Sequence, residues 1–214
     1  MKTASRIISW LFVPLLTPIY GLMIAMYVPS QEKYQLLEHP GLYELLPAHK
    51  NQLLFMYFMA NVVIPLFFFS LLKFNGRITT VEIDDRRERG LPLIMMFLTS
   101  LMLYLSSIYL IDESYSKFLF AYPLAGVFAS VAYFFLNRWK KVSLHGGGVG
   151  IMTGFIFAYV TEMQMYESWI LWASIIVSGL VCSARIYLEK HTLLEIVVGW
   201  FTGALITFAV NYFY

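Results

Sequence analysis

Seven long runs of apolar residues set the strongest limit on what this 214-residue chain can fold into. Most of the runs reach or approach the 20 or so residues that a helix needs to cross a bilayer core of about 30 Å. They cover residues 7–28, 53–72, 91–111, 118–136, 149–160 with its flanks, 169–186 and 193–212. We therefore predict an all-α fold, in which a single integral-membrane domain over 1–214 forms a polytopic bundle of six to seven transmembrane helices.

The composition excludes the other broad classes of protein. Only 13% of the residues are charged and 59% are hydrophobic, whereas an average soluble domain has roughly 25% charged residues. Disorder requires low hydrophobicity and high net charge, but the net charge here is +2. The single cysteine, Cys182, leaves no internal disulfide and no metal site built from cysteines.

The first and the fifth apolar runs are the least regular. The first follows Lys2 and Arg6 as a secretory signal would, but it is about 22 residues long and no small-residue cleavage site follows it. We therefore expect a retained span that is kinked at Pro14 and Pro18. Glycines interrupt the fifth run, which is the weakest and which sets the range of six or seven spans.

The charges separate once seven crossings are assumed, because the N-terminus and every second connection then share one membrane face. That face carries 12 of the 15 basic residues and six of the 13 acidic ones, so the two faces carry about +6 and −4. Basic residues also crowd the cytoplasmic ends of ordinary membrane helices, so the bias alone predicts no site. Two histidines, His145 and His191, lie on the basic face next to the starts of runs, whereas His39 and His49 lie opposite.

One segment of the basic face has the spacing of a catalytic group. Arg185 lies six residues before His191, and Glu195 lies four residues after it. Residues four apart share one face of a helix, so the carboxylate can hold one nitrogen of the imidazole and leave the other free to attack. A structural alternative is a capping box, in which Thr192 caps a helix and Glu195 reaches back to its amide. The two interpretations are compatible.

Two further segments on this face suit an anion. Ser143 and His145 precede a glycine run, where backbone amides can approach a ligand closely, as at Gly146. Alternatively, the glycines at 146, 150 and 154 form a small-residue stripe for helix packing. Arginines suit phosphate oxygens because their planar fork donates in pairs, and three of them precede the third run, although such charge runs are usually solvated. These arginines are Arg86, Arg87 and Arg89.

The order of these segments resembles the type-2 phosphatidic acid phosphatase superfamily, which includes lipid phosphate phosphatases and the vanadium haloperoxidases. The three blocks of that family are Lys-x6-Arg-Pro, Pro-Ser-Gly-His and Ser-Arg-x5-His-x3-Asp. The third block is matched by Arg185, His191 and Glu195, with glutamate in place of aspartate and one residue inserted after the serine. The second is matched by Ser143 and His145, without the proline and the glycine.

The first block has its counterpart in Arg89 and Pro92, without a lysine seven residues before the arginine. The resemblance thus extends over roughly half of the chain, from about Arg86 to Glu195, and the third block is its most specific part. It is a resemblance to bacterial integral-membrane members, which implies the bacterial inner membrane as the location. The side of the membrane that the site faces stays open.

The resemblance implies hydrolysis of a membrane lipid phosphate, a phosphomonoester or a pyrophosphate, by a phosphatase that needs no metal and no cofactor. His191 would attack phosphorus to form a phosphohistidine, Glu195 would orient it, and His145 would protonate the leaving oxygen and then assist water. The implied phosphate-binding residues are Arg185, Arg89, Ser143, Gly146, Arg86, Arg87 and Lys141. The implied partners are the lipid substrate and the bilayer, with no nucleic acid.

Two alternatives come from other classes of function. A lipid phosphotransferase would use the same residues and differ only in the acceptor of the phosphoryl group. A membrane transporter or scaffold would use none of them, but transporters generally place ionisable groups near mid-membrane. No charged residue or histidine lies deep inside an apolar run of this sequence, which disfavours a transporter.

Overall fold

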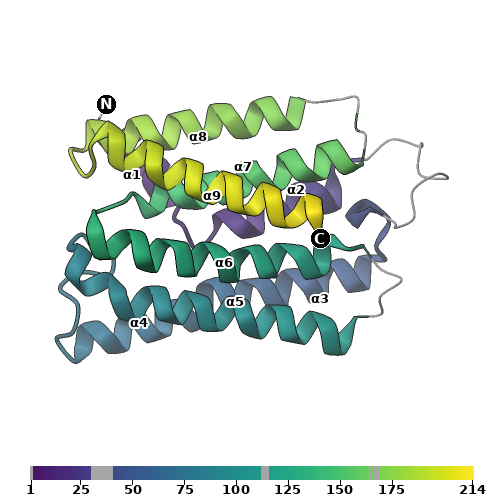
Figure 1. The fold of residues 1–214 in the computed structure, drawn as a ribbon, viewed down its shortest axis with the longest axis horizontal. Helices are drawn as coiled ribbons and strands as arrows, with labels where there is room; N and C mark the ends of the chain where they lie inside the picture. The colour runs from purple at the N-terminus through teal and green to yellow at the C-terminus, as the bar shows by residue number, and fades with distance from the viewer. Residues whose placement is uncertain (1, 30–40, 112–115, 164, 166–168) are drawn as a thin grey trace.

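The computed structural model describes residues 2–29, 41–111, 116–163, 165 and 169–214, and over these residues the chain is a bundle of helices without strands (Figure 1). Two short 3-10 turns, at Leu42–Glu44 and Arg86–Arg89, lie in the connections. The α-helices are α1 (Lys2–Leu11), α2 (Thr17–Tyr27), α3 (Pro47–Phe58), α4 (Ile64–Phe74), α5 (Gly90–Leu110), α6 (Phe118–Trp139), α7 (Leu144–Glu162), α8 (Trp169–Tyr187) and α9 (Leu193–Phe213).

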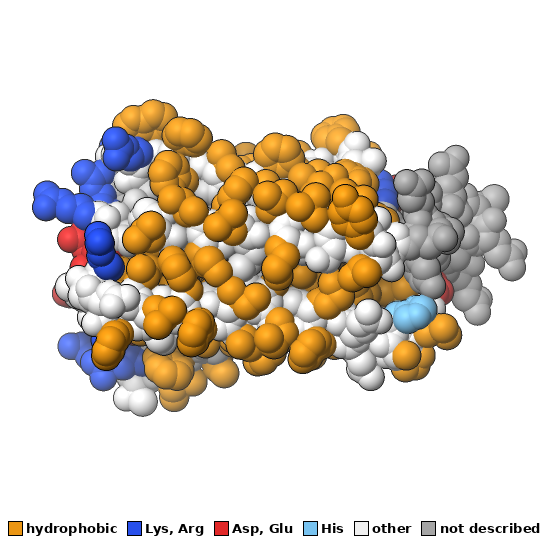
Figure 2. Space-filling model, turned by 90° about the horizontal axis from the view of Figure 1, so that it is seen from below, with side chains coloured by type: hydrophobic (Ala, Val, Ile, Leu, Met, Phe, Trp, Pro, Cys, Tyr) orange, Lys and Arg blue, Asp and Glu red, His pale blue; other side chains and the backbone are white. Residues whose placement is uncertain are grey.

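Six helical stretches in the described part of the chain are long and apolar enough to cross a membrane. The stretches are Pro47–Phe74, Arg86–Leu110, Phe118–Trp139, Leu144–Glu162, Trp169–Tyr187 and Leu193–Phe213. Apolar side chains cover the flank of the bundle in Figure 2, while charged side chains gather at its ends. The all-α membrane bundle predicted from the apolar runs is therefore confirmed.

The first predicted span is not one helix. It divides into α1 and α2, and neither is long enough to cross a bilayer alone. Pro14 lies in the break, because it lacks the N–H that a continuous helix needs. Side chains satisfy the carbonyls that the break frees: Thr17 Oγ1 donates to the Pro14 carbonyl (3.1 Å) and the Tyr20 hydroxyl donates to the Leu11 carbonyl (2.9 Å).

The second span accommodates its proline in another way. Between α3 and α4 the chain makes one π-helical turn, Met59–Val63, which ends two residues before Pro65. Asn61 Nδ2 donates to the Tyr57 carbonyl within this turn (3.1 Å). The helix therefore continues past the proline with a local widening and without a break.

The glycine-rich fifth run forms α7, the central helix of the bundle. In its most apolar stretch 72% of the residues are buried, against 22–50% in the other five spans. Its glycines allow backbone contact with α9, because a Cβ atom at Gly150 or Gly154 would clash with the carbonyls of Trp200 or Ala204. The small-residue packing stripe considered for these glycines is therefore present, and it accounts for the run's low hydropathy.

One end of the bundle is basic. The N-terminus and the α4–α5, α6–α7 and α8–α9 connections lie at the same end (Figure 1). In Figure 2 most of the visible Lys and Arg side chains gather there, with a few acidic ones among them. The charge separation expected from counting crossings thus appears in the fold, and α1 and α2 together bring the chain from this end to the other.

Candidate functional site

The starts of α7 and α9 lie side by side at the basic end, and this contact assembles the candidate site. The Ser143 amide donates to the Glu195 carbonyl (3.0 Å). Gly199 allows the approach, since a Cβ atom there would lie 2.5 Å from the Ser143 carbonyl oxygen. His145 and His191, which are far apart in the sequence, are consequently close enough to interact electrostatically.

Glu195 holds His191 across the predicted four residues, but the two do not share a helix face, because His191 precedes the Thr192 cap of α9. His191 Nδ1 lies 2.8 Å from Glu195 Oε2. The same carboxylate oxygen accepts the Thr192 amide (3.3 Å), and Thr192 Oγ1 accepts the Glu195 amide (3.4 Å), so the capping box is also present. Both interpretations of Glu195 therefore hold at once. A carboxylate on Nδ1 favours the tautomer with the proton on that nitrogen, which leaves the Nε2 lone pair free.

The imidazole of His191 is also tuned by its surroundings. Burial lowers its pKa to about 4, and the cations Lys141, Arg89 and Arg185 add to this, although the hydrogen bond with Glu195 acts in the opposite direction. At neutral pH the ring is therefore uncharged. An uncharged, oriented imidazole with a free lone pair is the form that can act as a nucleophile.

Arg185 is the least satisfied charged group of the site. Its side chain is only 4% exposed, and its Nε is buried without a hydrogen-bond partner among the described residues. No described carboxylate comes within ion-pair distance of it. A buried guanidinium without a partner is unfavourable unless an anion completes it. Arg185 thus keeps an unused donor near His191 that an anion could accept.

Arg89 is equally buried, at 2% exposed, but two of its three nitrogens donate to backbone carbonyls. Its Nε donates to the Ile83 carbonyl (2.9 Å) and its Nη1 donates to the Val142 carbonyl (2.7 Å). These bonds tie the segment before α5 to the start of α7. Arg89 therefore contributes positive charge near His191 while fixing the position of two connections.

Three predicted phosphate-binding residues have internal partners in the structure. Ser143 is fully buried and caps α7, and its Oγ accepts the amide of Gly146 (3.2 Å). The Gly146 amide is therefore already used. Lys141 Nζ donates to the Lys190 carbonyl (3.1 Å), and its charge acts on His191.

Two predicted arginines lie outside the cluster. Arg86 Nη1 donates to the carbonyls of Trp139 (2.9 Å) and Arg138 (3.5 Å), and it thereby neutralises the C-terminal end of α6. Arg87 is exposed, and its amide donates to Asp85 Oδ1 (2.9 Å). The structure thus brings together His191, His145, Glu195, Arg185, Arg89 and Lys141, and it does not bring Arg86 or Arg87 to them.

Sequence reasoning missed three residues next to the cluster. Lys190 forms an ion pair with Asp84 (2.6 Å), and the backbone of Ser9 in α1 faces the His145 imidazole. The position of Lys190 directly before His191 was a usable signal. Nothing in the sequence pointed to Asp84 or Ser9, because their proximity depends on how the connections fold back.

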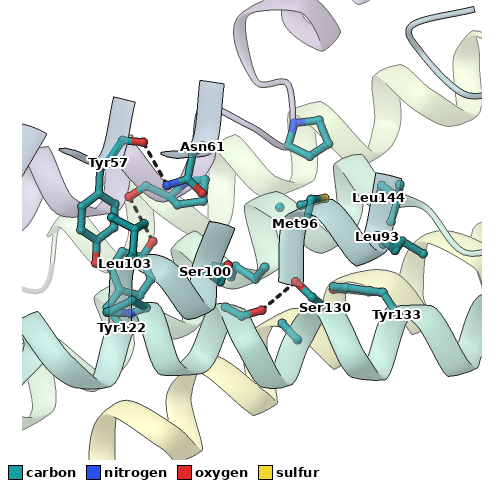
Figure 3. Close-up of a pocket in the computed structure, with 17 residues that line it drawn as sticks. Tyr57, Asn61, Leu93, Met96, Ser100, Leu103, Tyr122, Ser130, Tyr133 and Leu144 are labelled. Carbon is teal, nitrogen blue, oxygen red and sulfur yellow. Dashed lines mark hydrogen bonds between the residues drawn. The ribbon is translucent and has the colours of Figure 1, made fainter. Parts of the chain in front are cut away.

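A cavity of about 50 Å³ lies between α3, α5, α6 and α7 (Figure 3). Tyr57, Asn61 and Ser100 are among its polar lining residues, and none of the predicted site residues lines it. Its volume suits a few water molecules and is too small for a hydrocarbon chain. The cavity therefore does not enclose the apolar part of a lipid.

The fold defines the class of this protein as a helical membrane protein with several spans. Comparisons with protein-family models, with curated proteins and with solved structures found no match to the chain. The function must therefore be inferred from the geometry of the site.

Proposed function

We propose that this protein hydrolyses the phosphate of a membrane lipid through a phosphohistidine intermediate. The observation that carries the proposal is buried Arg185, whose Nε has no hydrogen-bond partner among the described residues, near an imidazole that a carboxylate orients. Phosphoryl transfer depends mostly on positioning and on stabilisation of negative charge. Arg185, a buried cation that no described carboxylate pairs with directly, and the uncharged imidazole near it supply both requirements.

The reaction has two steps that balance. In the first, Nε2 of His191 attacks phosphorus, an N–P bond forms, and the bond from phosphorus to the lipid oxygen breaks while His145 gives that oxygen a proton. In the second, His145 takes a proton from water, the water oxygen bonds to phosphorus, and the N–P bond breaks. Inorganic phosphate leaves, and both histidines return to their starting forms. Glu195 stabilises the positive charge that develops on His191.

A lipid is the substrate class that fits the location of the site. The cluster lies at the end of the helices, where the headgroups of a bilayer would meet it, and the flank of the bundle is apolar (Figure 2). A substrate anchored in the membrane presents its phosphate at this level while its chain stays among the lipids. The resemblance of 183–195 to the third block of the phosphatase superfamily supports the same class.

The test is phosphate release by detergent-purified protein from a panel of lipid phosphomonoesters and lipid pyrophosphates. We expect His191→Ala to abolish release, while His49→Ala, at the opposite end of the bundle, leaves it unchanged. Appearance of a new phospholipid in place of inorganic phosphate would identify a phosphotransferase instead. Equal release by wild type and His191→Ala on every substrate would refute the proposal.

A further inference from the structure

An acidic side chain lies within the cation cluster. Asp84, in the connection before α5, accepts a hydrogen bond from Lys190 Nζ at 2.6 Å, and Glu82 lies 3.9 Å from the same nitrogen. Lys190 belongs to the α8–α9 connection and directly precedes His191. The ion pair therefore joins two connections at the edge of the candidate site.

Asp84 interacts electrostatically with other cations of the cluster besides its direct partner, Lys190. Partial burial raises the pKa of its carboxyl, but the hydrogen bond from Lys190 and the charges of Lys190, Arg185 and Lys141 outweigh this and lower it. Conversely, Glu82 and Asp84 are the acidic groups that act on Arg185. Asp84 is thus the carboxylate that balances the cations in the absence of a phosphate.

An exposed ion pair contributes little to stability by itself, and here both side chains are 38% exposed. The ion pair with Lys190 therefore adds too little stability to explain by itself why Asp84 lies in this cluster. The same cluster contains Arg185, whose Nε lacks a partner among the described residues. A carboxylate and a phosphate present the same kind of acceptor oxygens to lysine and arginine. The two anions therefore compete for the same donors.

We propose that Lys190 is a further phosphate-binding residue of this site and that Asp84 is its resting counter-ion, which an incoming phosphate displaces. The inference rests on the proposed function, because it assumes that a phosphate group enters the cluster. This competition limits the affinity of the site for inorganic phosphate. After hydrolysis, Asp84 pairs with Lys190 again and so favours release of the phosphate product.

The test measures the dissociation constant of inorganic phosphate for the detergent-purified full chain by titration calorimetry. For Asp84→Asn we expect phosphate to bind about fivefold more tightly, because a competing carboxylate contributes up to about 1 kcal/mol. For Lys190→Gln we expect binding to weaken by a similar factor. Glu189→Gln is the control for net charge. Like Asp84→Asn it removes one negative charge, but at an exposed residue next to Lys190 in the α8–α9 connection.

Unchanged or weaker binding by Asp84→Asn would overturn the inference, as would equal tightening by Glu189→Gln, which would indicate a general effect of net charge. Thermal unfolding checks that each variant is folded, and Glu82→Gln, with a smaller shift in the same direction, replaces Asp84→Asn if that variant does not fold. Phosphate binding that tightens in Asp84→Asn without any lipid hydrolysis would sustain the anion site and refute the phosphatase. Lipid hydrolysis with no response of phosphate binding to Asp84→Asn would refute this inference and sustain the phosphatase. The absence of both phosphate binding and lipid hydrolysis in every form would refute both.

Discussion

At the scale of single residues, one carboxylate oxygen of Glu195 both orients His191 and caps the start of α9. Its Oε2 contacts both the His191 imidazole (2.8 Å) and the Thr192 amide (3.3 Å). The helix start and the orientation of the histidine are therefore fixed together. This sharing makes the two contributions separable by experiment, because one depends on the charge of Glu195 and the other on Thr192.

Thr192→Ala should mainly lower stability, whereas Glu195→Gln should mainly lower activity. Thr192→Ala removes the cap and should cost about 1 kcal/mol of stability while leaving most of the activity. Glu195→Gln keeps a capping-box side chain but loses the charge that stabilises the developing imidazolium, so kcat should fall by at least about tenfold. Thermal unfolding and phosphate release measure the two effects. Equal activity loss in both variants would mean that the cap alone matters.

The pKa of His191 predicts the pH dependence of the reaction. Because it is about 4 in the folded protein, the nucleophile stays uncharged as the pH falls from 7 to 5, and kcat/KM should drop only below that, with a midpoint of about 4. An acid limb near the ordinary histidine value of about 6.5 would show that the ring is not desolvated when the proposed reaction takes place. The measurement is a pH profile of kcat/KM for a short-chain phosphate ester.

The same lowered pKa links pH to folding. The unfolded chain binds a proton at His191 near its ordinary value of about 6.5, before the folded chain does. Stability contributed by the uncharged ring is therefore fully present above about pH 6.5 and is lost as the pH falls through about 4. His191→Gln should flatten this part of the curve of thermal midpoint against pH. An unchanged curve would contradict the linkage.

At the scale of elements, α7 and α9 form the frame on which both histidines depend. Gly150 of α7 faces the Trp200 carbonyl so closely that no side chain fits between the two helices. The sequence showed the glycines but not their partner, because a stripe of small residues fits several neighbouring helices. Because glycines lower the hydropathy of α7, it appeared in the sequence to be the weakest span, although it is the most buried of the six.

Gly150→Ala should push α7 away from α9 and lower stability by about 1–3 kcal/mol, and phosphate release should fall with it because the histidines separate. Gly179→Ala in α8 is the control, since a Cβ atom there meets no heavy atom within 4 Å. Removing that glycine should leave stability unchanged or slightly higher. Thermal unfolding in detergent compares the two, and equal midpoints would contradict the close packing.

At the scale of the whole molecule, counting crossings predicted the basic end correctly even though the first span is broken. The count depends only on which end each connection reaches, and α1 and α2 together still traverse the bundle (Figure 1). The membership of the site was harder to predict. Arg86, Arg87 and Arg89 were all predicted to bind phosphate, but only Arg89, the one matched to the Arg-Pro block, turns inward and holds the Ile83 and Val142 carbonyls.

The topology predicts a clear labelling pattern. In a Cys182→Ser background, single cysteines at Arg77 and Lys140 should react with an impermeant reagent from one side of the membrane, and cysteines at Leu46 and Tyr214 from the other. All four positions are exposed. Labelling in oriented vesicles measures this and also shows which side the candidate site faces. Reaction of Arg77 and Lys140 from opposite sides would contradict the common basic end.

The parallel pairing of α7 and α9 also bears on biosynthesis. Two helices that begin at the same end cannot be neighbours along the chain, and α8 must first return across the membrane between them. His145 is synthesised before His191, and the Ser143 amide can reach the Glu195 carbonyl only after α9 has inserted. A nascent chain therefore has no complete histidine pair until α9 is in place.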